Sequence, residues 1–117
     1  MSDLNKVMLI GRLGSKPELK QLSSGDSLTK LSVATSWESK KEGVREEHTE
    51  WHNVTVFGKQ ADACAKYLDK GRLVYVEGSL RQKRWKAKDG TERFDREVRA
   101  ETVTFLSSPP RGEARAA

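Results

Sequence analysis

The stretch that decides the fold is residues 48–71, His-Thr-Glu-Trp-His-Asn-Val-Thr-Val-Phe-Gly-Lys-Gln-Ala-Asp-Ala-Cys-Ala-Lys-Tyr-Leu-Asp-Lys-Gly, because the spacing of its apolar side chains changes once. Up to Gly58 the side chains alternate between two sets, which is typical of a strand. From Lys59 the apolar residues recur at intervals of three and four, which indicates a short helix. Lys70 and Gly71 predict the end of that helix, since a cation in the last turn and a glycine just past it are common there.

The strand and the helix of this stretch each have two distinct sides. On one face of the strand, rings alternate with polar side chains: Trp51, Asn53, Thr55 and Phe57. The opposite face carries His52, Val54 and Val56. We therefore expect the first face to meet water and the second to meet the core. The helix is predicted to bury one stripe, which consists of Ala61, Cys64, Ala65 and Leu68.

Strand patterns also occur on both sides of this stretch. The predicted strands are residues 4–14, 28–37, 48–58, 72–84 and 93–106. Gly11 and Gly14 predict a bend or bulge in the first strand, Asp89-Gly90 predicts a hairpin turn before the last, and the charged segment between the second and third predicts a solvated connection. Five strands with one helix between the third and fourth predict a mainly β fold, the five-stranded Greek-key OB barrel. An SH3-like barrel usually lacks such a helix and a ferredoxin-like fold needs two, so both are weaker alternatives.

Length and composition restrict the class of protein. The 117 residues suit one domain, with 35% hydrophobic and 33% charged residues. We assign residues 1–106 to the barrel and residues 107–117, rich in Ser, Pro, Gly, Arg and Ala, to a flexible tail. Apolar runs are too short to span a membrane, and the first residues show no leader pattern. We expect a cytoplasmic protein.

Charge is distributed unevenly along the chain. The formal net charge is +5, from 22 Lys and Arg against 17 Asp and Glu. Residues 81–88 hold five cations and one tryptophan without an acid, whereas residues 38–50 hold five acids against three cations. A concentrated basic segment favours a polyanionic partner.

No set of residues suits catalysis or metal binding. The two histidines, His48 and His52, lie on one predicted strand, about 13 Å apart at ~3.4 Å per residue, which is too far to share a metal or a proton. Cys64 is the single cysteine, and it is predicted to be a buried small hydrophobe that forms no disulfide or zinc site. No glycine-rich phosphate loop is present. We expect no enzyme, no cofactor and no metal.

Four aromatic residues stand among polar and basic neighbours: Trp37, Trp51, Phe57 and Trp85. Flat rings on a solvated strand face beside cations suit single-stranded nucleic acid, because every base has a π-face and cations follow the phosphates. Duplex readers place a helix in a groove instead, and the predicted helix here is short and alanine-rich. The remaining aromatics are interpreted as packing or subunit-contact residues: Tyr67, Tyr75, Phe94 and Phe105.

Four segments in order carry a likeness to a known family: NKVMLIGRLG at 5–14, TEWHNVTVFGK at 49–59, YLDKG at 67–71 and YVEGSLR at 75–81. With Trp85 at the expected distance after the last, the chain resembles the bacterial single-stranded DNA-binding protein (SSB) family over about residues 3–106. The resemblance implies an OB fold that assembles as a homotetramer, around which single-stranded DNA wraps without sequence preference. It also implies that the protein acts at the nucleoid, in DNA replication, recombination and repair.

The resemblance also implies roles for individual residues. Base stacking is implied for Trp51, Phe57 and Trp85. It is also implied for Trp37, although this residue lies slightly earlier in the sequence than the family's usual spacing predicts. Phosphate contacts are implied for Lys6, Lys59, Lys70, Arg81, Lys83 and Arg84. Some members carry a basic residue after the Trp-His pair, where this chain has Asn53, so one electrostatic contact is expected to be missing.

The C-terminal end departs from the family pattern. Members usually continue into a Gly/Pro/Gln-rich linker whose acidic tip, ending in Pro-Phe, recruits replication and repair proteins. Residues 111–117 are basic instead. A trimmed DNA-binding core is favoured over a short member that lacks the tip, and partner recruitment is not assigned to the residues present.

Three alternatives stay open. An OB module for RNA, or a primosome-type accessory protein, would use the same stacking and phosphate contacts, because reading the 2′-OH needs polar groups that the pattern does not place. An assembly module would use the rings as subunit contacts. An enzyme fragment is the weakest of the three, since no acid–base pair or metal set is present.

Overall fold

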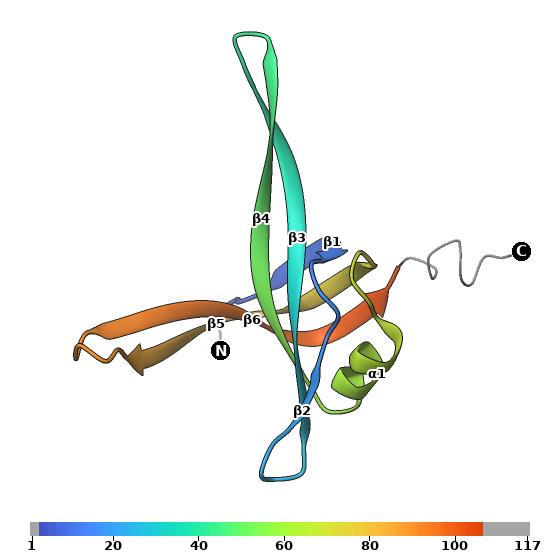
Figure 1. Ribbon diagram of the computed structural model, residues 1–117, viewed down its shortest axis with the longest axis vertical. Coiled ribbons are helices and arrows are strands. Elements are labelled where there is room, and N and C mark those ends of the chain that lie inside the picture. Colours follow the sequence, from blue (N-terminus) through green and yellow to red (C-terminus); the bar gives the residue numbers. More distant parts are fainter. Residues whose placement is uncertain (1–2, 107–117) are drawn as a thin grey trace, which may run out of the picture.

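The structure, a computed structural model, describes residues 3–106. Figure 1 shows a β-barrel from which two long hairpins project, with one helix at one end. The elements are β1 (Val7–Leu13), β2 (Leu19–Gln21), β3 (Ser27–Lys41), β4 (Val44–Phe57), α1 (Lys59–Tyr67), β5 (Leu73–Lys86) and β6 (Glu92–Phe105). The tail predicted at residues 107–117 lies outside the described residues.

The long strands close into a ring. The sheet order is β1-β5-β6-β4-β3-β2, and an additional pairing of β1 with β3 closes the ring, with β2 left at the edge. The pairings are antiparallel except for that of β4 with β6. Five long strands therefore form the barrel, as predicted, with α1 between the third and fourth of them. The three-residue β2, which was not predicted, adds to the edge of β3.

The barrel closes where β1 passes from β5 to β3, and a glycine permits this crossing. β1 pairs with β5 along most of its length and with β3 only at Arg12 and Leu13. A Cβ atom on Gly11 would lie 2.2 Å from the backbone oxygen of Ala34, so only glycine lets the strands approach this closely. The glycine serves a close approach instead of the predicted bulge, and the register shift lies in β5 at Gly78.

The core is built from inward-facing strand residues and one side of α1. The fully buried members on the strands are mostly valines, which pack well on a pleated surface: Leu31, Val33, Val54, Val56, Val74 and Val76. Ala61, Cys64 and Leu68 cover one end of the barrel and are at most 1% exposed. The predicted stripe is therefore buried at these three positions, of which Ala61 and Cys64 lie on α1 and Leu68 lies just past its end. Burial raises the pKa of the Cys64 thiol to about 11.

The helix ends earlier than predicted. Its last residue is Tyr67, and Leu68 already has an extended conformation while its side chain enters the core. Gly71 lies in the following loop, where its N–H donates to the carbonyl of Leu13. The pattern of Lys70 and Gly71 marks that loop rather than the last turn. The helix in residues 3–106 is too short and too polar to cross a membrane.

The segment predicted as a charged connection is instead part of a long hairpin. β3 and β4 pair continuously out to Lys41 and Val44, and the turn between them is Glu42-Gly43. Both turn residues have positive φ, 52° and 79°, which is the backbone that continues the twist of paired strands. Because charged side chains on a projecting hairpin meet water on both sides, they do not interrupt its backbone ladder. We call residues 36–49 the β3–β4 arm (Figure 1).

Candidate nucleic-acid interface

The strand register identifies which side chains share a face, because paired residues point to the same side of a sheet. The pairs on β3 and β4 next to the barrel that point away from the core are Leu28 with Phe57, Lys30 with Thr55, Ser32 with Asn53, and Ala34 with Trp51. Trp51 and Phe57 therefore share one side, as the alternation predicted. Lys30, which was not among the predicted site residues, joins them.

Each ring on β4 is positioned by a neighbour. Trp51 is 58% exposed, and a Cβ atom on Gly14 would lie 2.5 Å from Cζ3 of its indole, so the ring rests against the chain at Gly14. Phe57 is half-buried. The guanidinium carbon of Arg99 lies 4.6 Å from the centroid of the Phe57 ring, in a cation–π contact. Trp51 thus presents an open ring, whereas Arg99 already covers one face of Phe57.

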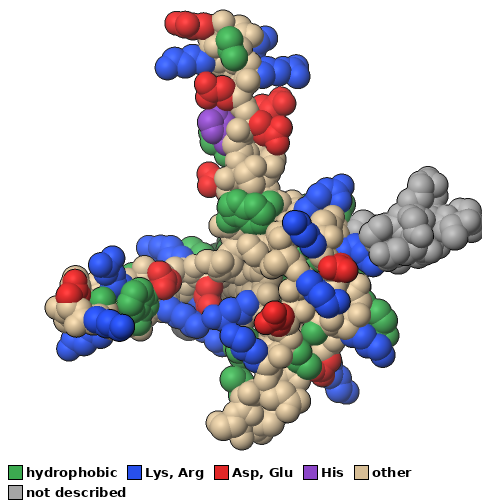
Figure 2. Space-filling view, in the orientation of Figure 1, with side chains coloured by type: hydrophobic (Ala, Val, Ile, Leu, Met, Phe, Trp, Pro, Cys, Tyr) green, Lys and Arg blue, Asp and Glu red, His purple; other side chains and the backbone are tan. Residues whose placement is uncertain are grey.

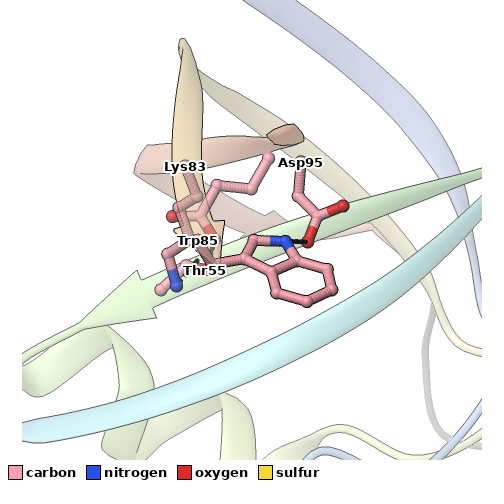
Figure 3. Close-up of polar contacts among 5 residues, drawn as sticks. Thr55, Lys83, Trp85 and Asp95 are labelled. Carbon is pink, nitrogen blue, oxygen red and sulfur yellow. Dashed lines mark hydrogen bonds and ion pairs between the residues drawn. The ribbon is translucent and has the colours of Figure 1, made fainter. Parts of the chain in front are cut away.

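Trp85 reaches the same side from β5 and is held by a carboxylate on β6. Its indole N–H donates to Oδ2 of Asp95 at 2.7 Å (Figure 3). Nearby, Nζ of Lys83 lies 3.6 Å from Oε1 of Glu97, and the same oxygen accepts a hydrogen bond from Oγ1 of Thr55 at 3.0 Å. These contacts connect β5 to β4 across β6.

We call this side of the sheet the outer face and define it by five side chains: Lys30, Trp51, Phe57, Lys83 and Trp85. Figure 2 shows Lys and Arg side chains gathered where the β5–β6 hairpin joins the barrel. Rings and cations thus lie together there, as a ligand with flat groups and negative charge requires.

Thr55 departs from the solvated position predicted for it. Its side chain is 3% exposed, and that of Glu97 is 8% exposed. The cause is β6, which runs parallel to β4 beside Val54 and Thr55 and covers this part of the strand. Alternation along β4 does not reveal that cover, because it comes from a segment far away in the chain.

A hollow of about 360 Å³ lies in the outer face. It is lined by Lys30, Asn53, Val54, Thr55, Lys83, Asp95, Arg96 and Glu97. Sequence reasoning missed Lys30, the cation that β3 contributes to this hollow. Spacing along β3 carries a signal for Lys30, since it lies four residues before Ala34, on the same side of the strand. Arg96 also lines the hollow, but it is opposite Gln82 on β5, so its side chain belongs to the other side of the sheet from Lys83.

The model of the single-strand binding protein (SSB) family matches residues 4–106. The chain belongs to this family. An SSB from Plasmodium falciparum, solved in complex with ssDNA, is 33% identical with a TM-score of 0.83, over 92% of this chain and 98% of that one. A deletion mutant of the single-stranded DNA binding protein from Thermus aquaticus is 34% identical with a TM-score of 0.77, over 89% of this chain and 51% of that one.

These matches confirm the resemblance and the OB fold expected from the sequence. The chain is a single-stranded DNA-binding protein of the SSB family, which is a DNA-binding family and not one of enzymes. It spans about half the length of the Thermus aquaticus chain.

In this SSB, Trp37 lies away from the other three predicted stacking residues. The register pairs it with His48, on the opposite side of the β3–β4 hairpin from Trp51. Its indole stacks on the His48 ring, with centroids 4.3 Å apart and an interplanar angle of 22°. Nε2 of His48 also lies 2.9 Å from Oγ of Ser39. Trp37 is therefore a half-covered ring on the arm, and its role in stacking stays a prediction.

The structure divides the six predicted phosphate ligands among several places. Arg81 and Lys83 lie on the same side of β5 as Trp85. The Arg84 side chain points to the other side, with its guanidinium carbon 5.3 Å from the Phe94 ring centroid. The remaining three lie elsewhere: Lys59 at the start of α1, Lys70 in the loop after it, and Lys6 just before β1.

Lys6 is engaged by a carboxylate. Its Nζ lies 2.6 Å from Oε2 of Glu77. This contact raises the pKa of Lys6 and, together with a hydrogen bond from Tyr75, lowers the pKa of Glu77 from its usual 4.5. A phosphate would have to displace Glu77 to reach this lysine.

Proposed function

We propose that the outer face of this SSB binds single-stranded DNA by stacking bases on Trp51, Phe57 and Trp85 and by pairing phosphates with adjacent cations. The observation that carries the proposal is the register, which brings rings from β4 and β5 to one side of the sheet. Trp51 and Trp85 are 58% and 47% exposed, so their rings are accessible to a ligand.

Stacking on such rings gives binding without sequence preference. It contributes about 1–3 kcal/mol per base and tolerates every base, since each has a π-face. The hydrogen bond from Trp85 to Asp95 fixes the indole by its edge and leaves the ring faces free. A ring that is already oriented loses less conformational entropy when a base stacks on it.

Phosphate binding in this proposal falls first on Arg81 and Lys83, which lie on the same side of β5 as Trp85. The Lys83 side chain is 54% exposed, so a phosphate can take the place of Glu97 as its partner. With roughly five phosphates neutralised per subunit, log K falls against log salt with a slope near −3.5, about 0.7 per contact on a single strand. The other predicted cations would extend this set.

Intrinsic tryptophan fluorescence during titration with oligo-dT tests the proposal. We expect strong quenching by oligo-dT, little response to a duplex of equal length, and weaker binding at high salt. Competition with oligo-U of equal length separates DNA from RNA preference. Unchanged fluorescence with no binding would contradict the proposal and favour an assembly module, in which the rings are subunit contacts. In that case Trp85→Ala would dissociate the oligomer.

A second part of the proposal is that the chain assembles as a homotetramer, as is typical of the family. Met8 and Ile10 on β1 are 63% and 58% exposed. Before Arg12, β1 pairs only with β5, so one edge of it has no neighbouring strand within residues 3–106. An unpaired edge beside exposed apolar side chains suits a contact with a second copy. Sedimentation equilibrium measures the mass.

The biological role follows from the ligand. Single strands are exposed in replication, recombination and repair, and a bound SSB keeps them from re-annealing, folding or being cleaved. We propose that the protein acts on such strands at the nucleoid in the cytoplasm.

A further inference from the structure

A second hollow next to the outer face is lined mainly by lysines. It measures about 250 Å³ and is lined by Ser15, Lys16, Glu18, Lys20 and Lys30. Lys30 also lines the larger hollow between β4 and β6. The two hollows therefore meet at Lys30, so that a basic surface continues from the rings to the segment before β2 and to β2 itself.

The register places this second hollow on the same side of the sheet as the rings. Lys20 on β2 is opposite Leu28 on β3, and Leu28 is opposite Phe57 on β4. Neighbouring strands are about 4.8 Å apart, so Lys20 lies two spacings, about 10 Å, from the Phe57 position. Lys30 is between them on β3, opposite Thr55.

The three lysines of this hollow have no acidic partner. Within residues 3–106, no carboxylate forms an ion pair with Lys16, Lys20 or Lys30, although Glu18 lines the same hollow. Lys83, in contrast, is already paired with Glu97 in the outer face. Three like charges around one hollow repel each other unless an anion lies between them. With three lysines that are unpaired in the described part of the chain against one acid, the hollow is better suited to a polyanion than the part of the outer face where Lys83 is paired with Glu97.

Lys30 also supplies charge where β4 has none. Asn53, which follows Trp51 and His52, is neutral and lines the larger hollow together with Lys30. A cation on β3 therefore stands beside the neutral position on β4. A strand whose bases stack on the rings of β4 would meet Lys30 first and Lys20 next along the surface.

We propose that Lys30, Lys20 and Lys16 form a second phosphate-binding stretch, which continues the path of the DNA from the rings of the outer face to β2. The ligand is the phosphodiester backbone of a single strand. This inference rests on the proposed function, since the rings must bind the bases that lead the backbone there.

The test is the salt dependence of oligo-dT binding by the double variant Lys20→Gln/Lys30→Gln. Glutamine keeps most of the side-chain length and removes the charge. We expect the slope of log K against log salt to become shallower by about 1.4, or 0.7 for each lost contact. Because of the shallower slope, the variant should bind oligo-dT about 25-fold more weakly than the parent at 0.1 M salt. Near 1 M salt the two affinities should be nearly equal.

The matched control is Lys41→Gln/Lys66→Gln, which removes the same net charge elsewhere. Lys41 lies at the end of β3 beside the arm turn, and Lys66 lies in the last turn of α1. We expect this control to keep the slope of the parent. All four lysines are exposed, so both variants are expected to fold, which circular dichroism checks.

Oligo-dT of increasing length provides an independent readout. The parent should gain affinity up to a greater length than Lys20→Gln/Lys30→Gln, because only the parent holds the backbone beyond the rings. An unchanged slope and length dependence in that variant, or an equal loss in the control, would overturn the inference. If the parent itself shows no quenching by oligo-dT, the proposed function has failed, and the inference is overturned with it.

Discussion

Gly14→Ala tests whether Trp51 must occupy its observed position to bind DNA. The new Cβ atom would lie 2.5 Å from Cζ3 and 2.8 Å from Cη2 of the Trp51 indole. Carbon atoms in contact are ordinarily about 3.5–4.0 Å apart, so the ring must move by roughly 1 Å or more. Trp51 is 58% exposed and its ring is the far end of a flexible side chain, so it can move without disturbing the core.

The expected result is a selective loss of binding. If the displaced ring no longer stacks on a base, up to about 1–3 kcal/mol is lost, which is roughly 5- to 150-fold in affinity for oligo-dT. The free energy of unfolding should change by no more than about 0.5 kcal/mol. The slope of log K against log salt should stay that of the parent, because no cation is removed. Fluorescence titration at several salt concentrations and thermal unfolding measure these quantities.

Gly11→Ala is the matched control for Gly14→Ala. Its Cβ atom would lie 2.2 Å from the backbone oxygen of Ala34, where neither strand can yield without opening the β1–β3 junction. We expect this variant to lose about 1–3 kcal/mol of stability or more. The reasoning is refuted if Gly14→Ala binds like the parent, if its affinity loss comes with a changed salt slope, or if it is destabilised as much as Gly11→Ala.

Three further predictions concern single side chains. Trp37→Phe should lower the affinity for oligo-dT less than Trp85→Phe, because His48 covers one face of the Trp37 ring; parallel titrations compare the two, and an equal loss would contradict this. The contact with Lys6 lowers the pKa of Glu77 from its usual 4.5. The ion pair therefore stabilises the fold at pH values above 4.5, and this stabilisation is lost as the pH falls through the lowered pKa. Lys6→Gln should therefore reduce Tm near neutral pH, and this difference should shrink as the pH falls below the usual 4.5; a difference that stays constant into acid would argue against the pair. Burial raises the pKa of Cys64 to about 11, so a thiol reagent at neutral pH should react only after unfolding, and rapid reaction with the native protein would count against that burial.

The pattern of the sequence was sufficient where neighbours along the chain decide the structure. Alternation predicted that Trp51 and Phe57 share a side of β4, and the spacing of Ala61 and Cys64 predicted the buried side of α1. Both are local consequences of strand and helix geometry. The charged residues of the β3–β4 arm predicted a connection, but a solvated hairpin continues its pairing although its composition is that of a loop.

The candidate site could be predicted only in part, because its members come from strands distant in the chain. The basic segment around Trp85 is visible as a run of residues. The partners that hold it are not, since Asp95 and Glu97 reach Trp85 and Lys83 only after β5 and β6 have paired. Nor does the sequence separate Trp37 from the other rings, a separation that depends on which residues of β3 and β4 are opposite each other.

The succession of the long strands and the helix along the chain can be predicted from the sequence, and so can the presence of rings beside cations. Each of these depends on local periodicity and residue type. The closure of β1 on β3, the burial of Thr55 beneath Glu97 and the meeting of two hollows at Lys30 are tertiary facts. They depend on register between distant strands, where a shift by one residue would turn every side chain to the opposite face. The sequence thus supplies the rings and charges, and the barrel decides which of them one strand of DNA can touch together.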